Sequence, residues 1–161
     1  MLFNSWQYAL FLPVVFAIYW GLPQKFRWVL LFVASYYFYM SWNTKYVVLI
    51  LFTTIISYLA AIFLERFREN SRAKKFILIF TLISCLGVLF TFKYFNFFAQ
   101  SVIDFLNLFV PVKLHSVTLK LLLPVGISFY TFQTLSYVID VYRGNVKAEK
   151  HFGIYATFIS F

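Results

Sequence analysis

The side chains best suited to chemistry lie on one polar stretch in the last third of this 161-residue sequence. Gln133, Ser136 and Asp140 are separated by three and then four positions, so they share one face of a helix. An amide, a hydroxyl and a carboxylate on one face could line a polar cavity, such as a tunnel that binds a substrate. The alternative is that they form hydrogen bonds between membrane helices, which contribute roughly 0.6 kcal/mol each.

The histidines and the cysteine are poor candidates for catalysis. His115 falls in a short connector and His151 follows a basic run, so we expect both to be solvated near a membrane surface. No Ser-His-Asp arrangement follows from two such peripheral histidines. Cys85 is the single cysteine and is predicted to be a small apolar residue inside a helix. These three side chains also lack the spacing of zinc ligands, so we assign neither a catalytic residue nor a metal site.

Composition places the polar stretch in a membrane protein. Hydrophobic residues make up 63% of the chain and charged residues 12%, whereas a soluble domain has about 45–50% and about 25%. A soluble chain of this size buries only about 70% of the surface that it exposes when unfolded. So much apolar surface could not be hidden, which excludes a water-soluble enzyme domain. We predict an all-α integral membrane protein, folded as a polytopic helical bundle.

Apolar stretches locate the helices of a single membrane domain over residues 1–161, since a spanning helix needs about 20 mostly apolar residues. Four helices are predicted to cross at 6–22, 26–42, 46–64 and 76–92. A fifth, at 121–143, carries polar groups on two faces, and we expect neighbouring helices or water to shelter it from lipid. A last helix over 152–161 is too short to span, so we expect the chain to be part of a longer protein.

The net charge of +9 indicates the orientation of these helices. Basic residues cluster in or beside the loops after the first and third helices, whereas the loop after the second has only Lys45. The positive-inside rule therefore places the two basic loops in the cytoplasm and the N-terminus outside. Because the basic residues punctuate apolar runs, we attribute them to orientation and to contact with the lipid bilayer, and we expect no nucleic-acid partner.

Two further segments are interpreted as structural. Segment 94–110 is an apolar helix with one polar stripe, formed by Asn96, Gln100, Asp104 and Asn107. We predict that it lies in the membrane interface, because a span there would place the basic residues after position 142 outside; spanning is the alternative. At the end of helix 121–143, Gly144 is predicted to be the C-cap and Arg143 to be favourable in the last turn. Asp140 and Arg143 could form an ion pair there.

Residues 123–144 carry a resemblance to a known family. They read Leu-Pro-Val-Gly-Ile-Ser-Phe-Tyr-Thr-Phe-Gln-Thr-Leu-Ser-Tyr-Val-Ile-Asp-Val-Tyr-Arg-Gly. This stretch closely resembles a signature of bacterial membrane-bound O-acyltransferases of the alginate O-acetyltransferase type. Three further stretches are similar to the N-terminal region of that family: Phe3-Asn-Ser with Phe11-Leu-Pro-Val, Ala34-Ser-Tyr-Tyr-Phe-Tyr with Trp42-Asn-Thr-Lys-Tyr, and Phe92-Lys-Tyr-Phe-Asn-Phe-Phe98.

The resemblance implies an enzyme of the bacterial inner membrane, of which this chain would be the N-terminal part of a ring of tilted helices around a tunnel. Such an enzyme transfers acyl groups, acetyl by the resemblance, to hydroxyls of a cell-envelope polysaccharide such as alginate. The donor, acetyl-CoA or another acyl carrier, is a substrate, and no bound cofactor is expected. An extracytoplasmic acyltransferase could be a partner. The essential histidine of the family would lie beyond Phe161, so the chain is expected to be inactive alone.

Two other functions stay open at this point. A polar helix interrupted by proline and glycine is also typical of a transporter or channel, although no internal repeat is visible in the sequence. A small structural membrane protein is the other alternative. The short apolar run at the end of the chain disfavours it, because that run cannot span a membrane by itself.

Overall fold

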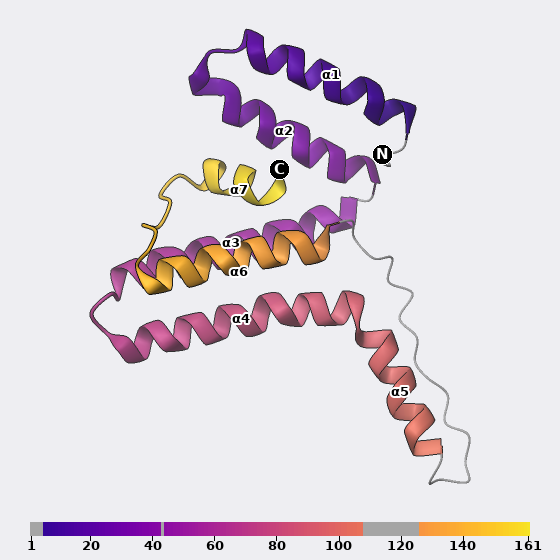
Figure 1. The fold of residues 1–161 in the computed structure, drawn as a ribbon, viewed down its shortest axis with the longest axis vertical. Helices are drawn as coiled ribbons and strands as arrows, with labels where there is room; N and C mark the ends of the chain where they lie inside the picture. Colours follow the sequence, from indigo (N-terminus) through magenta and orange to yellow (C-terminus); the bar gives the residue numbers. More distant parts are fainter. Residues whose placement is uncertain (1–4, 43, 108–125) are drawn as a thin grey trace.

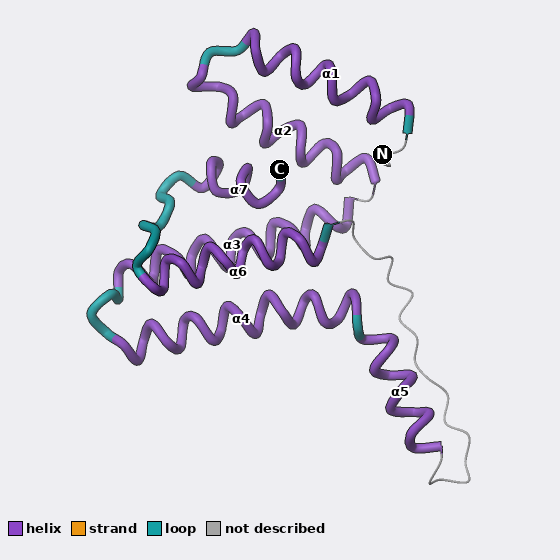
Figure 2. The backbone as a smooth tube through the Cα atoms, viewed as in Figure 1, coloured by secondary structure: helices purple, strands orange, loops and turns teal. Residues whose placement is uncertain are grey.

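The computed structural model describes residues 5–42, 44–107 and 126–161, and all regular structure within these ranges is α-helical, as predicted (Figures 1 and 2). The helices are α1 (Trp6–Gly21), α2 (Gln24–Trp42), α3 (Thr44–Arg66), α4 (Ser71–Lys93), α5 (Phe95–Asn107), α6 (Ile127–Arg143) and α7 (Phe152–Ser160). The predicted positions 108–110 and 121–125 lie outside the described residues, as does His115.

Most helix bounds differ from the predicted ones by a few residues, and the largest difference in the described part is at the start of α4. This helix begins at Ser71 rather than at position 76. The side chain of Asn70 accepts a hydrogen bond from the backbone N–H of Ala73 at 3.2 Å, so it caps the helix there. The basic residues Arg72, Lys74 and Lys75 therefore belong to the first turns of α4 and not to a loop, because capping rather than hydropathy sets the start.

The helices pack so that α6 lies in the interior of the bundle. α1 contacts α2, α7 lies between α2 and α3, and α6 packs along both α3 and α4 (Figure 1). One buried cluster joins Tyr36 of α2, Ile50 of α3, Leu89 of α4, and Tyr130 and Tyr155 of α6 and α7. This arrangement buries one side of the polar helix α6, whereas Phe129 and Phe132 on another side are exposed.

Small hydroxyl residues are buried in both α3 and α6, which pack against each other. Thr53, Thr54 and Ser57 of α3 and Thr131 and Thr134 of α6 are all fully buried. Most of these hydroxyls bond within their own helix: Thr54 Oγ1 donates to Ile50 O and Thr134 Oγ1 donates to Tyr130 O, both at 2.7 Å. Small side chains let two helix backbones approach closely, and the bonded hydroxyls are not left unpaired inside the bundle.

The ends of the helices fall into two groups. The loops after α1, α3 and α6 lie at one end of the bundle, at the left of Figure 1. At the opposite end, Lys93 Nζ at the end of α4 donates to Ser128 Oγ at the start of α6, at 3.2 Å. α5 starts at that opposite end, and its 13 residues rise only about 20 Å, short of the roughly 30 Å of a bilayer core. The end of α4 and the start of α6 therefore lie at the same end of the bundle.

The outer helices expose their apolar side chains, which is the pattern of a membrane protein. Within the described residues, α4 and the part of α3 over Val47–Arg66 are long and apolar enough to cross a membrane. α1 buries none of its residues, and Trp6 and Trp20 are 85% and 65% exposed. The hydrophobic groups of this layer face outward, where lipid or further helices can cover them.

Candidate functional site

The three predicted site residues of α6 border one pocket. Gln133, Ser136 and Asp140 line a cavity of about 580 Å³ between α6, α7 and the segment that joins them. The remaining lining residues are Tyr137, Val146, Lys147, Glu149, Ile154, Tyr155 and Phe158. The spacing of three and four positions thus identified one wall of a pocket. That this pocket belongs to an acyl-transfer tunnel stays a prediction.

Hydrogen bonds fix the walls of this pocket to the rest of the bundle. Gln133 Nε2 donates to the carbonyl oxygen of Phe158 at 2.8 Å, which links α6 to α7. Tyr137 OH accepts from the backbone N–H of Glu149 at 2.8 Å, and Tyr155 OH donates to Ser57 Oγ at 2.7 Å. The Tyr137 and Tyr155 rings lie 4.8 Å apart. The aromatic wall is therefore held from α3, α6 and the joining segment at once.

Asp140 brings a partly buried carboxylate to the end of the pocket that is nearest the basic loops. Its Oδ1 accepts from Asn145 Nδ2 at 3.4 Å. The ion pair expected with Arg143 is wrong: both residues are described, and no salt bridge joins them, because the exposed Arg143 points to a different pocket. Lys147 and Glu149 line the same cavity as Asp140, so charged groups of both signs stand at this end.

Gly144 ends α6 in the left-handed conformation, at φ 82°. Its N–H bonds to Val141 O, and the N–H of Asn145 bonds to Asp140 O, which is a glycine-capped helix end of the predicted kind. The cap turns the chain into the segment before α7. That segment is anchored by the N–H of Ala148, which donates to Glu65 Oε2 at 3.2 Å. The cap therefore positions the charged side of the pocket.

His151 has a structural role that the sequence did not reveal. It is the N-cap of α7, where its Nδ1 accepts from the N–H of Ile154 at 3.3 Å. Its ring also meets the Trp28 ring edge-on at 4.8 Å, next to Gly153, where an added Cβ would collide with Trp28. Ser, Thr, Asp and Asn are the usual N-cap residues, so a histidine before an apolar run was no signal for a cap.

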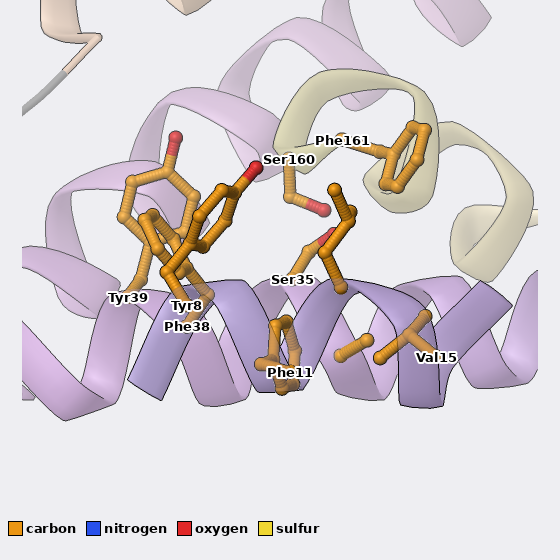
Figure 3. A pocket seen from close by; sticks show the side chains of 10 residues that line it. Tyr8, Phe11, Val15, Ser35, Phe38, Tyr39, Ser160 and Phe161 are labelled. Carbon is orange, nitrogen blue, oxygen red and sulfur yellow. The ribbon is translucent and has the colours of Figure 1, made fainter. Parts of the chain in front are cut away.

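A second, smaller pocket lies on the far side of α7. It has a volume of about 160 Å³ where α1, α2 and the last residues of α7 meet (Figure 3). Its lining is aromatic and aliphatic with hydroxyls from Tyr8, Ser35, Tyr39 and Ser160, and no lining residue is charged. Without an acid or a base it is a less suitable place for acyl transfer than the pocket on α6.

Relatives that are named as O-acetylating enzymes match this chain along nearly its whole length. A probable alginate O-acetylase of Pseudomonas aeruginosa is 36% identical over 94% of this chain, and one of Azotobacter vinelandii is 34% identical over 94%. A peptidoglycan O-acetyltransferase of Helicobacter pylori is 34% identical over 90%. By this similarity the chain is related to O-acetylating enzymes of the membrane-bound O-acyltransferase type. The resemblance carried by residues 123–144 is thereby confirmed.

The match covers a minor part of these relatives. It takes in 29% of the Pseudomonas aeruginosa protein, 30% of the Azotobacter vinelandii protein and 27% of the Helicobacter pylori protein, so the chain spans less than a third of their length. No family model and no solved structure matches the chain. In this chain, residues 127–144 of the signature segment form α6 and its glycine cap, and the pocket of about 580 Å³ lies along that helix.

Proposed function

We propose that this chain is the N-terminal part of a bacterial inner-membrane enzyme that transfers acetyl groups to hydroxyls of a cell-envelope polysaccharide such as alginate. The observation that carries the proposal is the 36% identity to a probable alginate O-acetylase across 94% of the chain. The donor would be acetyl-CoA or another acyl carrier on the cytoplasmic side. The acceptor would be the polysaccharide itself or an extracytoplasmic acyltransferase that passes the group on.

The distribution of basic residues supports a cytoplasmic position for one end of the bundle, with the N-terminus outside. Ten basic residues fall in the loops after α1, α3 and α6 or in the adjoining turns of the helices: Lys25, Arg27, Arg66, Arg68, Arg72, Lys74, Lys75, Arg143, Lys147 and Lys150. Three loops that are far apart in sequence therefore carry like charge on one side, as the positive-inside rule requires. In this orientation α5 lies at the outer interface.

The pocket on α6 would then open toward the cytoplasmic donor. Asp140 and Lys147 stand at its cytoplasmic end, and Gln133 and Phe158 lie deeper between the two helices. The residues of this chain would bind and orient the donor and exclude water, and we assign none of them to the chemical step. Binding energy of this kind places the reacting groups together before the reaction starts.

Replacing Asp140 by Asn in the full-length protein tests this role. We expect O-acetylation of the polysaccharide in cells to fall about tenfold or more, because a carboxylate that positions a substrate is lost, while the membrane content of the protein stays unchanged. Acetyl release from isolated polysaccharide measures the first quantity, and quantitative immunoblotting measures the second. A strain that lacks the gene supplies the baseline, and unchanged O-acetylation in that strain would contradict the proposed function itself.

The matched control is Asp104→Asn. Asp104 is exposed on α5, away from the pocket, and its Oδ1 accepts from Gln100 Nε2 at 2.8 Å, which an asparagine oxygen can also do. We expect near-normal O-acetylation from this variant. If Asp140→Asn lowers protein content and O-acetylation together, Asp140 is a structural residue and the pocket is not the donor site.

A further inference from the structure

A separate pocket at the basic end of the bundle collects cations from three parts of the chain. It has a volume of about 200 Å³. Arg68 comes from the turn after α3, Lys74 from the first turn of α4, and Arg143 and Lys147 from the end of α6 and the segment beyond it. Leu64, Val141, Val146 and Ala148 form its apolar walls.

The charges in this pocket are not balanced. Glu65 is the one carboxylate among its lining residues, and its Oε2 already accepts the N–H of Ala148 at 3.2 Å. Among the described residues, the structure records no salt bridge to any of the four cations. Lys74 Nζ lies 4.9 Å from the centre of the Tyr142 ring, which leaves its N–H groups able to donate elsewhere. Four cations that face one space repel one another, and a bound anion would relieve that repulsion.

Membrane orientation alone does not explain this convergence. Arg66, Arg72 and Lys75 lie at the same end of the bundle and serve the positive-inside rule equally well, yet none of them lines the pocket. Two arginines in one small space are suited to an anion with several acceptor oxygens, such as a phosphate, because each planar guanidinium presents several donors in a fixed fork. The apolar side chains of Leu64, Val141, Val146 and Ala148 border the same space, so the pocket is not lined by charge alone.

We propose that this pocket binds the phosphate group of an organic phosphate at the cytoplasmic surface of the membrane. The phosphate could belong to an anionic phospholipid headgroup or to a soluble phosphate ester such as the acyl donor. The pocket shares Val146 and Lys147 with the larger pocket on α6. A donor held here by its phosphates could extend its acyl end past those two residues. That soluble case rests on the proposed function, whereas the lipid case does not.

Ligand-induced thermal stabilisation of the purified full-length protein tests the proposal. The soluble probes are 4′-phosphopantetheine and pantetheine, which differ by one phosphate group. The lipid probes are nanodiscs of phosphatidylcholine with and without phosphatidylglycerol. We expect 4′-phosphopantetheine but not pantetheine, or phosphatidylglycerol beyond phosphatidylcholine, to raise the melting temperature; the first result identifies a soluble phosphate ester and the second a lipid headgroup. If neither pair of probes differs, the proposal is overturned.

Two double variants with the same loss of charge decide whether the pocket is responsible. Arg68→Gln with Arg143→Gln removes two lining arginines, and we expect the affinity for the active probe to fall about tenfold or more. Arg66→Gln with Arg72→Gln removes two arginines at the same end that do not line the pocket, and we expect less than about a twofold change. Equal losses in the two double variants would show a diffuse surface charge and overturn the proposal.

A single variant keeps the test valid if the Arg68→Gln/Arg143→Gln double variant misfolds. Lys147 is exposed, so Lys147→Gln should leave the ligand-free melting temperature unchanged and still weaken the active probe several-fold. Because these measurements report binding, they remain decisive if the O-acetylation experiment fails. An unchanged affinity in both Lys147→Gln and the Arg68/Arg143 variant would contradict the pocket as the phosphate site.

Discussion

Hydrophobicity and burial are related in opposite ways in the outer helix α1 and the inner helix α6. α1 is apolar along its length and buries none of its residues, whereas α6 carries the polar signature and buries seven residues, among them Thr131 and Thr134. A soluble protein would place these two helices the other way round. The difference shows that α1 presents its apolar surface outward, while close packing holds the polar helix α6 in the bundle.

The strongest test of whether α6 is packed more tightly than α1 is to enlarge one side chain in each helix. Thr134 is fully buried, so Thr134→Leu should overpack the contact with α3 and lower the free energy of unfolding by about 1–3 kcal/mol, although leucine is more hydrophobic. Val14 of α1 is 56% exposed, and Val14→Leu should have almost no effect. Thermal unfolding of the full-length protein in detergent measures both. Equal shifts in the two variants would mean that α6 is not packed more tightly than α1.

Glycines offer a second comparison, with a smaller expected effect. A Cβ added at Gly153 of α7 would collide with the Trp28 ring of α2 and lie 3.2 Å from His151, whereas a Cβ at Gly87 of α4 meets nothing within 4 Å. Gly153→Ala should therefore destabilise the protein by about 1 kcal/mol or more. Gly87→Ala should stabilise it by up to about 1 kcal/mol, because alanine is the better helix former. The same unfolding assay decides, and a gain in stability from Gly153→Ala would contradict the close approach of α2 and α7.

These contrasts also show what could be predicted from the sequence. The long apolar runs predicted the helices, and the spacing of Gln133, Ser136 and Asp140 predicted that they share a face. The start of α4 at Ser71 was missed because it depends on the Asn70 cap and not on hydropathy. The cap at His151 was missed because histidine is not a usual N-cap residue. The local sequence pattern was therefore sufficient for features that a single helix determines.

Features built from distant segments could not be predicted in this way. The far wall of the α6 pocket comes from Tyr155 and Phe158 of α7, whose position depends on contacts with α2 and α3. The four cations of the basic pocket, Arg68, Lys74, Arg143 and Lys147, were interpreted as orientation signals, because their convergence appears only when the ends of α3, α4 and α6 meet. The expected ion pair of Asp140 and Arg143 failed for a related reason: local spacing allowed it, but the two side chains line different pockets.

Gln133 tests whether a polar residue of α6 acts by holding the helices together or by lining the pocket. Its Nε2 donates to Phe158 O at 2.8 Å, so Gln133→Leu should remove one bond between α6 and α7 and lower the free energy of unfolding by roughly 0.6 kcal/mol. Ser136 lies on the same face, is exposed, and forms no hydrogen bond recorded in the described structure, so Ser136→Ala is the matched control with no expected change in stability. Measured together with O-acetylation, the two variants separate the roles. If Gln133→Leu reduces O-acetylation far more than this small loss of stability explains, Gln133 acts on the pocket. If O-acetylation falls only in proportion to stability, its bond to α7 is structural.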